Sequence, residues 1–270
     1  MSTSRAHHEI AHGQWLAAND PESVWGWGTP AGRRRAERRA KLIADAAALG
    51  PGVRALEIGC GGGMFTGMFA ATGASIVAVD ISPELIEIAK RRNLPQDRVR
   101  FATTRFEEMD PADPFDAVVG SSVLHHLEVE RSLQLMYALL KPGGRLAFAE
   151  PNLLNPQVWM ERRFRHWDRF KYVSPDETAF VRGPLARLLE ATGFVDIAIA
   201  PHDWLHPSTP RPLIPAIAGV GRALEFVPGV REIAGSLLIA AQRPASPDRR
   251  RPGGPGRAEA RPSPASKGAA

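Results

Sequence analysis

Short apolar runs alternate with longer amphipathic segments along most of the chain. The strand-like runs are residues 53–58, 75–80, 98–103, 115–122, 145–150, 194–200 and 235–242. Segments with apolar residues at helical spacing lie between them, at residues 63–72, 82–92, 128–141 and 178–192. Strands that alternate with helices of about 10–15 residues predict a parallel sheet with helices on both faces. The pattern therefore predicts an α/β fold with a doubly wound sheet.

Three longer segments do not fit this alternation: residues 1–52, 151–176 and 201–234. They carry tryptophans and histidines, and long connections in an α/β domain are usually functional or disordered. We therefore expect helical lids or substrate walls in these segments. The predicted organisation is an N-terminal lid with an aromatic loop (1–52), a main domain that contains the two insertions (53–242), and a tail (243–270).

The tail is rich in Pro, Gly, Ser and Arg and almost free of large apolar side chains. Such a composition buries too little apolar surface to offset the entropy of ordering, so we predict that the tail is disordered. Its seven Lys or Arg and two Asp or Glu account for the whole net charge of +5. Because the preceding residues are neutral, the sequence argues against a nucleic-acid-binding protein, whose basic excess would lie on the fold itself.

Hydrophobic residues make up 44% of the chain and charged residues 23%, as in a globular protein with a sizeable core. No run approaches the roughly 18 apolar residues of a membrane span, and the N-terminus lacks the apolar stretch of a secretory signal. Cys60 is the only cysteine, so we expect no internal disulfide and a cytoplasmic protein. Peripheral contact with a membrane stays open, because residues 33–41 are basic and residues 210–235 are apolar.

A glycine cluster follows the first predicted strand, in the stretch ALEIGCGGG at residues 55–63. Glycines at this place allow a ligand to approach the backbone closely. About twenty residues later, Asp80 ends the second predicted strand, where its carboxylate can accept hydrogen bonds from both ribose hydroxyls of an adenosine. These two features fit any cofactor that contains adenosine, including NAD.

Two residues near the glycines separate the possible cofactors. A dinucleotide site requires a third glycine in the pattern G-x-G-x-x-G, and that position is Met64 here. The Glu57 carboxylate would repel a pyrophosphate, but it would attract a ligand with an ammonium and a sulfonium group. A nicotinamide oxidoreductase is therefore disfavoured. The alternative for Glu57 is a structural role, in which its carboxylate caps nearby backbone N–H groups.

Four motifs in sequence order resemble the class I S-adenosylmethionine-dependent methyltransferases of the small-molecule, type 11-like group. LEIGCGGG resembles the first motif and VAVDIS the acidic strand end after it, while FDAVVGSSVLHHL and LLKPGGRLAFAEPN resemble the fourth and fifth strands. The resemblance covers residues 53–242. It implies a Rossmann-like, mostly parallel sheet of seven strands, with residues 235–242 forming an antiparallel strand beside the fifth. It also implies S-adenosylmethionine as the cofactor, with the two insertions covering its methyl end.

The resemblance further implies contacts between individual residues and this cofactor. Glu57, Gly59 and Gly61 would surround its methionine part. Asp80 would hold the ribose, and Ile81 would pack on the adenine ring.

Two further places in the cofactor site follow from the same resemblance. Ser121, after the fourth strand, would offer its backbone to the amino group. Near the adenine the chain departs from the family, which typically has an acidic residue and then a small apolar one where this chain has Arg105 and Phe106. Phe106 would still offer its backbone N–H to the ring, and Glu107 would accept from the exocyclic amine.

A histidine pair, His125 and His126, follows the fourth predicted strand, at the edge where open α/β sheets bind ligands. Methyl transfer from a sulfonium is an in-line displacement, and a base that takes its proton helps a hydroxyl acceptor. Histidine is the natural base near neutral pH. His126, followed by His125, is therefore our catalytic candidate. The alternative is that both imidazoles are packed or capping groups.

Candidate substrate residues lie in the segments outside the alternation. Trp25 and Trp27 predict an ordered aromatic loop before a helix, which either holds an acceptor or packs in the core. His166 and His202 are further candidates for the substrate site. No metal is expected, because prolines bracket the stretch from His202 to His206 and oppose the helical spacing that would aim both imidazoles together.

The function that these observations predict is transfer of a methyl group from S-adenosylmethionine to an oxygen, nitrogen or carbon atom of a small molecule. A sugar, a polyketide-like compound or a lipid-linked compound would suit the tryptophan-bearing, partly apolar insertions. The alternative is a regulatory protein that binds the same cofactor without turnover. The two hypotheses share the cofactor site and differ in whether a methylated product forms.

Overall fold

The computed structural model describes residues 3–164 and 178–245, whose centre is a sheet of seven strands. The strand order is β3-β2-β1-β4-β5-β7-β6; β1 to β5 are parallel to one another, and β7 runs antiparallel to both β5 and β6. The predicted fold class, with its antiparallel strand beside the fifth, is confirmed. The strands are β1 (Arg54–Ile58), β2 (Ser75–Asp80), β3 (Val99–Thr103), β4 (Phe115–Ser121), β5 (Leu140–Pro151), β6 (Val195–His202) and β7 (Ser236–Gln242).

Nine α-helices are found in the described residues, together with short 3₁₀ segments. The helices are α1 (Thr3–Ala18), α2 (Pro21–Val24), α3 (Pro30–Ala46), α4 (Met64–Ala70), α5 (Pro83–Lys90), α6 (Val129–Leu139), α7 (Pro156–Arg163), α8 (Arg182–Thr192) and α9 (Ile214–Leu224). The 3₁₀ segments used below are η1 (Phe106–Glu108), η2 (Leu124–His126), η4 (Arg211–Leu213) and η5 (Val230–Ile233). None of the helices in the described ranges is long and apolar enough to cross a membrane.

Helix α5 begins where its sequence signals predict. The Ser82 hydroxyl accepts a hydrogen bond from the backbone N–H of Leu85 at 3.3 Å, and Pro83 occupies the first helical position. Helix α3 begins in the same way, because the Thr29 hydroxyl accepts from the N–H of Gly32 at 2.9 Å. These caps fix the entry points of two helices that contribute to the ligand cavity.

Two predicted boundaries are wrong, and strand pairing explains both. Residues 178–181 are not helical, because Phe180 pairs with Asn152 in an isolated parallel bridge and α8 begins only at Arg182. Strand β5 begins at Leu140, within the segment predicted to be helical, because Leu140 pairs with Phe115 of β4. A proline follows at position 142 and cannot donate a helical hydrogen bond, which favours the extended pairing.

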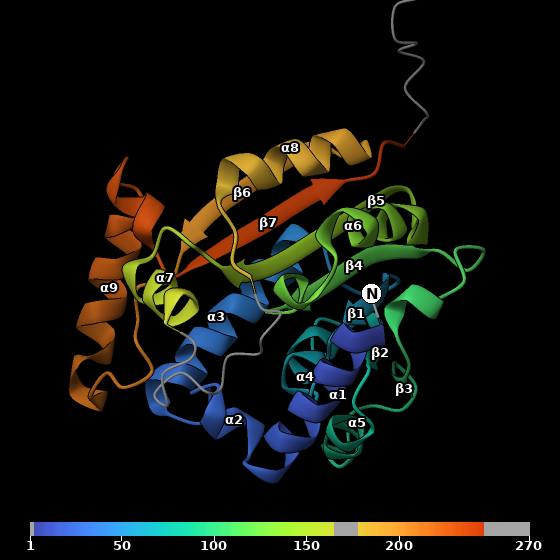
Figure 1. Ribbon diagram of the computed structural model, residues 1–270, viewed down its shortest axis with the longest axis horizontal. Helices are drawn as coiled ribbons and strands as arrows, with labels where there is room; N and C mark the ends of the chain where they lie inside the picture. Colours follow the sequence, from blue (N-terminus) through green and yellow to red (C-terminus); the bar gives the residue numbers. More distant parts are fainter. Residues whose placement is uncertain (1–2, 165–177, 246–270) are drawn as a thin grey trace, which may run out of the picture.

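The sheet has a core on each face (Figure 1). On one face, large apolar residues of the strands pack against α6 and α8, with Phe148 and Leu133 fully buried. On the other face, small strand residues such as Ala117 and Ala147 leave room for α3, α4 and α5, which contribute Ile43 and Phe69 among others. Helices therefore cover both faces, as a doubly wound sheet requires.

The remaining helices gather around the ends of the strands. Helix α1 lies beside α5 (Figure 1), where the Gln14 amide donates to Glu84 at 3.1 Å and Gly13 approaches Ser82 so closely that a Cβ atom would collide with it. Helix α9 packs beside α3 through contacts between Ile214 and Ala31. The segments outside the predicted alternation thus surround one edge of the sheet.

Candidate functional site

A cavity of about 680 Å³ lies at the carboxyl ends of β1, β2 and β4, within the size range of small-molecule sites. Gly59, Asp80 and Ser121, which end or follow these strands, contribute to its lining. Further lining residues come from α1, from the turn between α2 and α3, from α7 and from residues 203–207. Each of the three segments that break the predicted alternation therefore contributes to one cavity.

The glycine turn after β1 is fixed to the end of β2. Asp80 accepts hydrogen bonds from the backbone N–H of Gly61 at 2.8 Å and from that of Ser82 at 2.9 Å. Gly61 has a φ of 51°, a backbone conformation that glycine adopts without strain, and a Cβ atom there would lie 3.2 Å from the Trp25 ring. The turn thus presents backbone to the cavity, and the remaining lone pairs of Asp80 can accept from two hydroxyls.

Burial raises the pKa of Asp80, although its two backbone hydrogen bonds and the nearby His126 oppose that shift. The nearby Glu9 carboxylate acts in the same direction as burial. A ligand that donates hydrogen bonds to this carboxylate stabilises its charged form. The site at the end of β2 is therefore built for a donor such as a ribose hydroxyl.

Glu57 lies in β1 behind the glycine turn and outside the residues that line the cavity. Its side chain is buried, and burial raises the pKa of Glu57 to about 8, with the nearby Thr66 hydroxyl opposing the shift. A protonated carboxyl is thus favoured near neutral pH. A cationic ligand group nearby would favour the charged form, so contact with the methionine part stays a prediction.

Arg39 of α3 is a site residue that the sequence analysis did not single out. It is 5% exposed, lines the cavity and stands at the ends of three strands. Its guanidinium donates to the hydroxyls of Ser121 (3.3 Å) and Ser122 (2.8 Å), to the carbonyl oxygen of Ala149 (3.3 Å), and to the Ser236 hydroxyl. A buried cation therefore sits where β4, β5 and β7 meet.

The Arg39 guanidinium forms no direct ion pair within the described ranges, but the charges of Asp203 and Glu150 act on it and oppose the effect of burial. Its Nε is buried without a hydrogen-bond partner there. Burial lowers the pKa of Arg39 to about 10, which leaves the side chain charged at neutral pH. A carboxylate from a ligand would complete this environment. The signal in the sequence was helical spacing: Arg39 falls on the buried stripe formed by Gly32, Ala36 and Ile43.

The adenine side of the predicted site is lined by Ile81, Arg105, Phe106 and Glu107. Phe106 is buried in the first turn of η1. Arg105 and Glu107 form an ion pair, with 3.8 Å between Nε and Oε2. The departure from the family pattern thus places an arginine beside the predicted acceptor of the exocyclic amine, and the contact of Glu107 with the adenine stays a prediction.

His125 lies in η2, after β4, and the Glu150 carboxylate of β5 contacts its imidazole. Nδ1 of His125 is 2.7 Å from Oε2 of Glu150, and the other Glu150 oxygen accepts from the backbone N–H groups of Val123 and Leu124 at 2.9 Å each. Burial opposes the ionisation of Glu150, but the bond from His125 and those from the backbone prevail and lower the pKa of Glu150. Glu150 is therefore an anion that fixes His125 and the chain after β4.

His126 contacts the N-terminal helix. Its Nδ1 lies 2.9 Å from Oε2 of Glu9 in α1, and both residues line the cavity. The side chain of His126 is 18% exposed, compared with 5% for His125. The two imidazoles lie close together, with 4.2 Å between ring centroids, and His12 of α1 lies 6.4 Å from the His126 ring. Glu9 and His12 were missed, because no motif connects α1 with η2 in the sequence.

Aromatic residues form another wall of the cavity, to which Trp25, Trp27 and Trp204 contribute. Trp27 is buried, and its ring meets Phe65 edge-on with 5.7 Å between centroids. Trp25 is 39% exposed. The predicted aromatic loop is therefore partly core and partly wall. The Arg35 guanidinium also lies over the Trp27 ring, 5.2 Å from its centroid.

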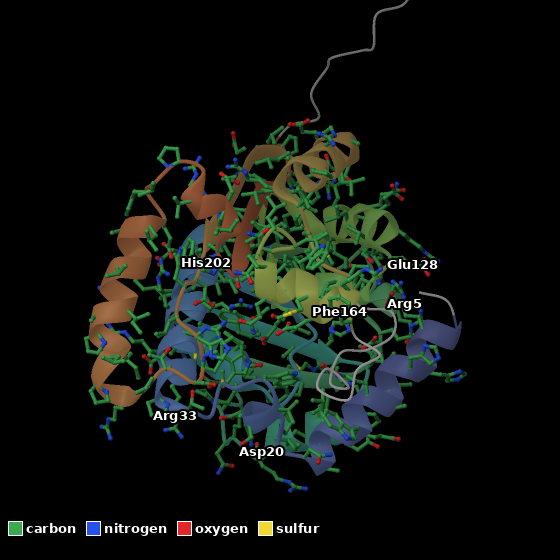
Figure 2. All side chains as sticks on the ribbon, turned by 60° about the vertical axis from the view of Figure 1, so that its left-hand side comes forward. Arg5, Asp20, Arg33, Glu128, Phe164 and His202 are labelled. Atoms are coloured by element: carbon green, nitrogen blue, oxygen red, sulfur yellow. The ribbon has the colours of Figure 1, made fainter. Side chains whose placement is uncertain are left out.

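The other candidate histidines do not meet in the cavity. His202, at the end of β6, is buried inside the molecule (Figure 2) and does not belong to the cavity lining. Burial and then the charge of Arg39 lower the pKa of His202 to about 4. His166 lies outside the described residues. Within the ranges that the structure covers, no group of three His, Cys, Asp or Glu side chains could hold a metal ion.

The basic run at residues 33–41 is only in part a solvated helix face. Arg35 pairs with Asp203 through a bidentate contact whose shortest distance is 2.7 Å, and Arg38 pairs with Glu225 at 2.5 Å. Lys41 remains on the surface with Asp45. Helix α3 therefore uses its arginines to hold the segment between β6 and β7 against the domain.

Comparison with known proteins agrees with this arrangement. Residues 56–146 match the family described as a methyltransferase domain. The chain is 32% identical over 158 residues to a ubiquinone biosynthesis O-methyltransferase of Rhodopseudomonas palustris. The alignment covers 53% of this chain and 60% of that protein. The chain thus spans well under two thirds of the length of this relative.

Two solved structures share the fold over most of the chain. The N-methyltransferase NodS from Bradyrhizobium japonicum in complex with S-adenosyl-L-homocysteine aligns with a TM-score of 0.61 and 20% identity, over 88% of this chain and 99% of that chain. The [4+2]-cyclase SpnF aligns with a TM-score of 0.58 and 22% identity, over 87% and 95%. These comparisons show a methyltransferase domain at residues 56–146 and the fold of these two structures over most of the chain.

The residues present fit S-adenosylmethionine as the cofactor of this domain. Asp80 and the Gly61 turn offer a carboxylate and close backbone that would suit a ribose. The cofactor's methionine end carries both an ammonium and a carboxylate, and the buried Arg39 guanidinium would suit the carboxylate. A diphosphate fits less well, because the position of the third glycine in a dinucleotide turn is Met64.

Proposed function

We propose that this protein transfers a methyl group from S-adenosylmethionine to a hydroxyl oxygen of a small molecule that binds in the cavity. The observation that carries this proposal is the convergence of three features on one cavity. These features are the Asp80 turn, the buried Arg39 guanidinium, and the pair formed by His126 and Glu9. The first two suit the cofactor, and the third suits removal of a proton from a hydroxyl.

S-adenosylmethionine, when bound, supplies an electrophilic methyl group. The residues of the chain then have to hold the acceptor in line with the breaking bond and to exclude water. Asp80 and Arg39 would fix the two ends of the cofactor, and α1 with the Trp25–Trp27 turn would cover it. A role in covering the cofactor accounts for the position of the N-terminal helix beside the glycine turn and α5.

His126 would act as the base for the acceptor hydroxyl. With Nδ1 protonated and facing the Glu9 carboxylate 2.9 Å away, Nε2 would carry the lone pair that can take the hydroxyl proton. Glu9 would hold the imidazole in this tautomer and would stabilise the imidazolium that forms, as a positioning residue. The greater exposure of His126 favours it over His125, whose carboxylate partner also organises the backbone after β4.

We infer that hydroxyl compounds are better acceptors than amines. An amine that is already deprotonated needs no base, whereas a hydroxyl gains about 10²–10⁴-fold from one. A carboxylate-oriented histidine in the cavity is therefore better used with a hydroxyl. Apolar and aromatic wall residues such as Trp27 and Trp204 favour an acceptor with a sizeable apolar or planar body.

The second candidate function is binding of the cofactor without methyl transfer. The solved structure of SpnF supports this alternative, because that protein has the same fold and is a [4+2]-cyclase. The fold alone therefore does not establish methyl transfer. Incubation of the protein with methyl-labelled S-adenosylmethionine and a panel of phenols, sugars and matching amines separates the two. We expect label in hydroxyl products, lost in His126→Gln. Tight cofactor binding with no labelled product from any acceptor would contradict the proposal.

A further inference from the structure

Helix α9 carries apolar side chains on its outer as well as its inner face. The inner face packs on the domain through Ile214 and Ile217, which contact Ala31 and Leu205. On the outer face of α9 and in the residues directly before and after the helix, five exposed apolar positions follow one another at intervals of three and four residues and form a stripe. They are Leu213, Ala216, Val220, Ala223 and Val227.

Several apolar side chains on α9 and next to it are highly exposed to solvent. Phe226 is 84% exposed, Val220 is 60% exposed and Leu213 is 51% exposed. In both views α9 forms the outer edge of the molecule (Figures 1 and 2). A helix that is apolar all round belongs in a core or in contact with lipid, and contiguous apolar patches mark interaction sites.

Charge on the outer face of α9 has one sign, whereas η5 carries Arg231 and Glu232, which pair with each other. No Asp or Glu occurs between residues 204 and 224, whereas Arg211 and Arg222 are exposed and make no ion pair within the described residues. The first acid that follows, Glu225, is turned inward, where its carboxylate pairs with Arg38 and accepts from the backbone N–H of Asp203. The outer face of α9 is therefore apolar with cationic flanks, which complements an anionic surface.

The apolar surface continues to the cavity. Val230 and Ile233 of η5 are 38% and 42% exposed. The Asn155 amide, at the start of α7, donates to the carbonyl oxygen of Ile233 at 2.8 Å, and Asn155 belongs to the cavity lining. Its neighbour Leu154 is 44% exposed. A surface that held the outer face of α9 would thus lie next to one wall of the cavity.

We propose that the outer face of α9, with Phe226 and η5, docks on an anionic lipid bilayer and lies in its interfacial region. Apolar side chains would enter the boundary between headgroups and acyl chains, while Arg211 and Arg222 would contact anionic headgroups. A second copy of the chain fits less well, because a two-fold contact of this face brings the arginines of both copies together. This binding is independent of methyl transfer and goes beyond the proposed function.

Co-sedimentation of the full chain with vesicles tests the proposal, without cofactor present. One set of vesicles is phosphatidylcholine alone, and the other contains phosphatidylglycerol as well. We expect binding to the mixed vesicles only, because the cationic flanks need anionic headgroups. The double variant Val220→Ser/Phe226→Ser should weaken binding at least about ten-fold. Its matched control is Val195→Ser in β6, which removes an exposed apolar side chain elsewhere and should leave binding unchanged.

Arginine variants test the electrostatic part of the proposal. Arg222→Ser should weaken binding to mixed vesicles about five-fold, whereas Arg187→Ser on α8 should not. The basic tail is present in every variant, so its contribution is the same throughout. Cofactor titration and thermal unfolding verify that each variant is folded. Equal binding of the α9 variants and their controls, or a concentration-dependent dimer in light scattering that the α9 double variant abolishes, would overturn the proposal.

Discussion

Nδ1 of His126, after β4, lies 2.9 Å from Oε2 of Glu9 in the N-terminal helix. This contact joins a residue that follows the central strands to a helix that covers the cavity from outside the predicted sheet. If α1 moved away, His126 would lose the carboxylate that lies beside its Nδ1. Closure of α1 and assembly of the proposed base would therefore be the same event.

Replacement of Glu9 by Gln should lower kcat about ten-fold or more while KM changes little, because the amide orients the imidazole but does not stabilise the imidazolium. Steady-state kinetics measure both parameters. Glu84→Gln is the control, because Glu84 contacts α1 through Gln14 outside the cavity. A loss confined to KM would contradict this role.

Arg39→Met should weaken binding of S-adenosylhomocysteine by at least about 30-fold, because a ligand carboxylate would lose its buried counter-charge. Arg39 also donates hydrogen bonds to three strands, so the melting temperature should fall as well. Arg38→Met is the matched control. It removes a neighbouring arginine whose partner is Glu225, away from the cavity, and should reduce stability without changing cofactor affinity. Equal effects of the two variants on affinity would argue against the proposed contact.

His202 should make the protein less stable in acid. Burial lowers its pKa in the folded protein to about 4, whereas the unfolded chain has the ordinary value near 6.5. The unfolded state therefore takes up a proton first as the pH falls below about 6.5, and stability decreases until about pH 4. The loss is on the order of 3 kcal/mol when both titrations are complete.

Denaturant unfolding at pH 7 and at pH 5 measures this effect. His202→Leu should have a smaller difference in unfolding free energy between the two pH values than the unmodified protein. The exposed His206, four residues later, provides the control His206→Gln, which should keep the original difference. If His202→Leu kept that difference too, another group would be responsible for the acid sensitivity.

The sheet and the glycine turn were predictable because they rest on local signals. Short apolar runs marked the strands. Gly61 and Asp80 follow or end two of these runs, which predicted that both lie at one edge of the sheet, where the structure joins them by a hydrogen bond of 2.8 Å. Strand ends in a parallel sheet meet at one edge whatever the loops do. Patterns of this kind determine position without any knowledge of tertiary contacts.

The other half of the site depends on contacts between distant segments. Glu9 and His126 are separated by more than a hundred residues, and nothing in either stretch indicates the partner. Arg39 lies within a basic run in which Arg35 and Arg38 form ion pairs with another segment, so composition alone did not distinguish it from its neighbours. Its place on the buried stripe of α3 was the signal, and helical spacing could have separated it from its neighbours.

The central claim is that Asp80 and the turn beside it bind an adenosine that carries a sulfonium or thioether rather than a diphosphate. Calorimetric titration with S-adenosylhomocysteine, and separately with NADH, tests it most directly on the unmodified protein, Asp80→Ala and the surface control Asp45→Ala. The account predicts binding of the thioether alone, lost in Asp80→Ala and kept in Asp45→Ala. Unchanged affinity in Asp80→Ala, or preferential binding of NADH, would contradict it.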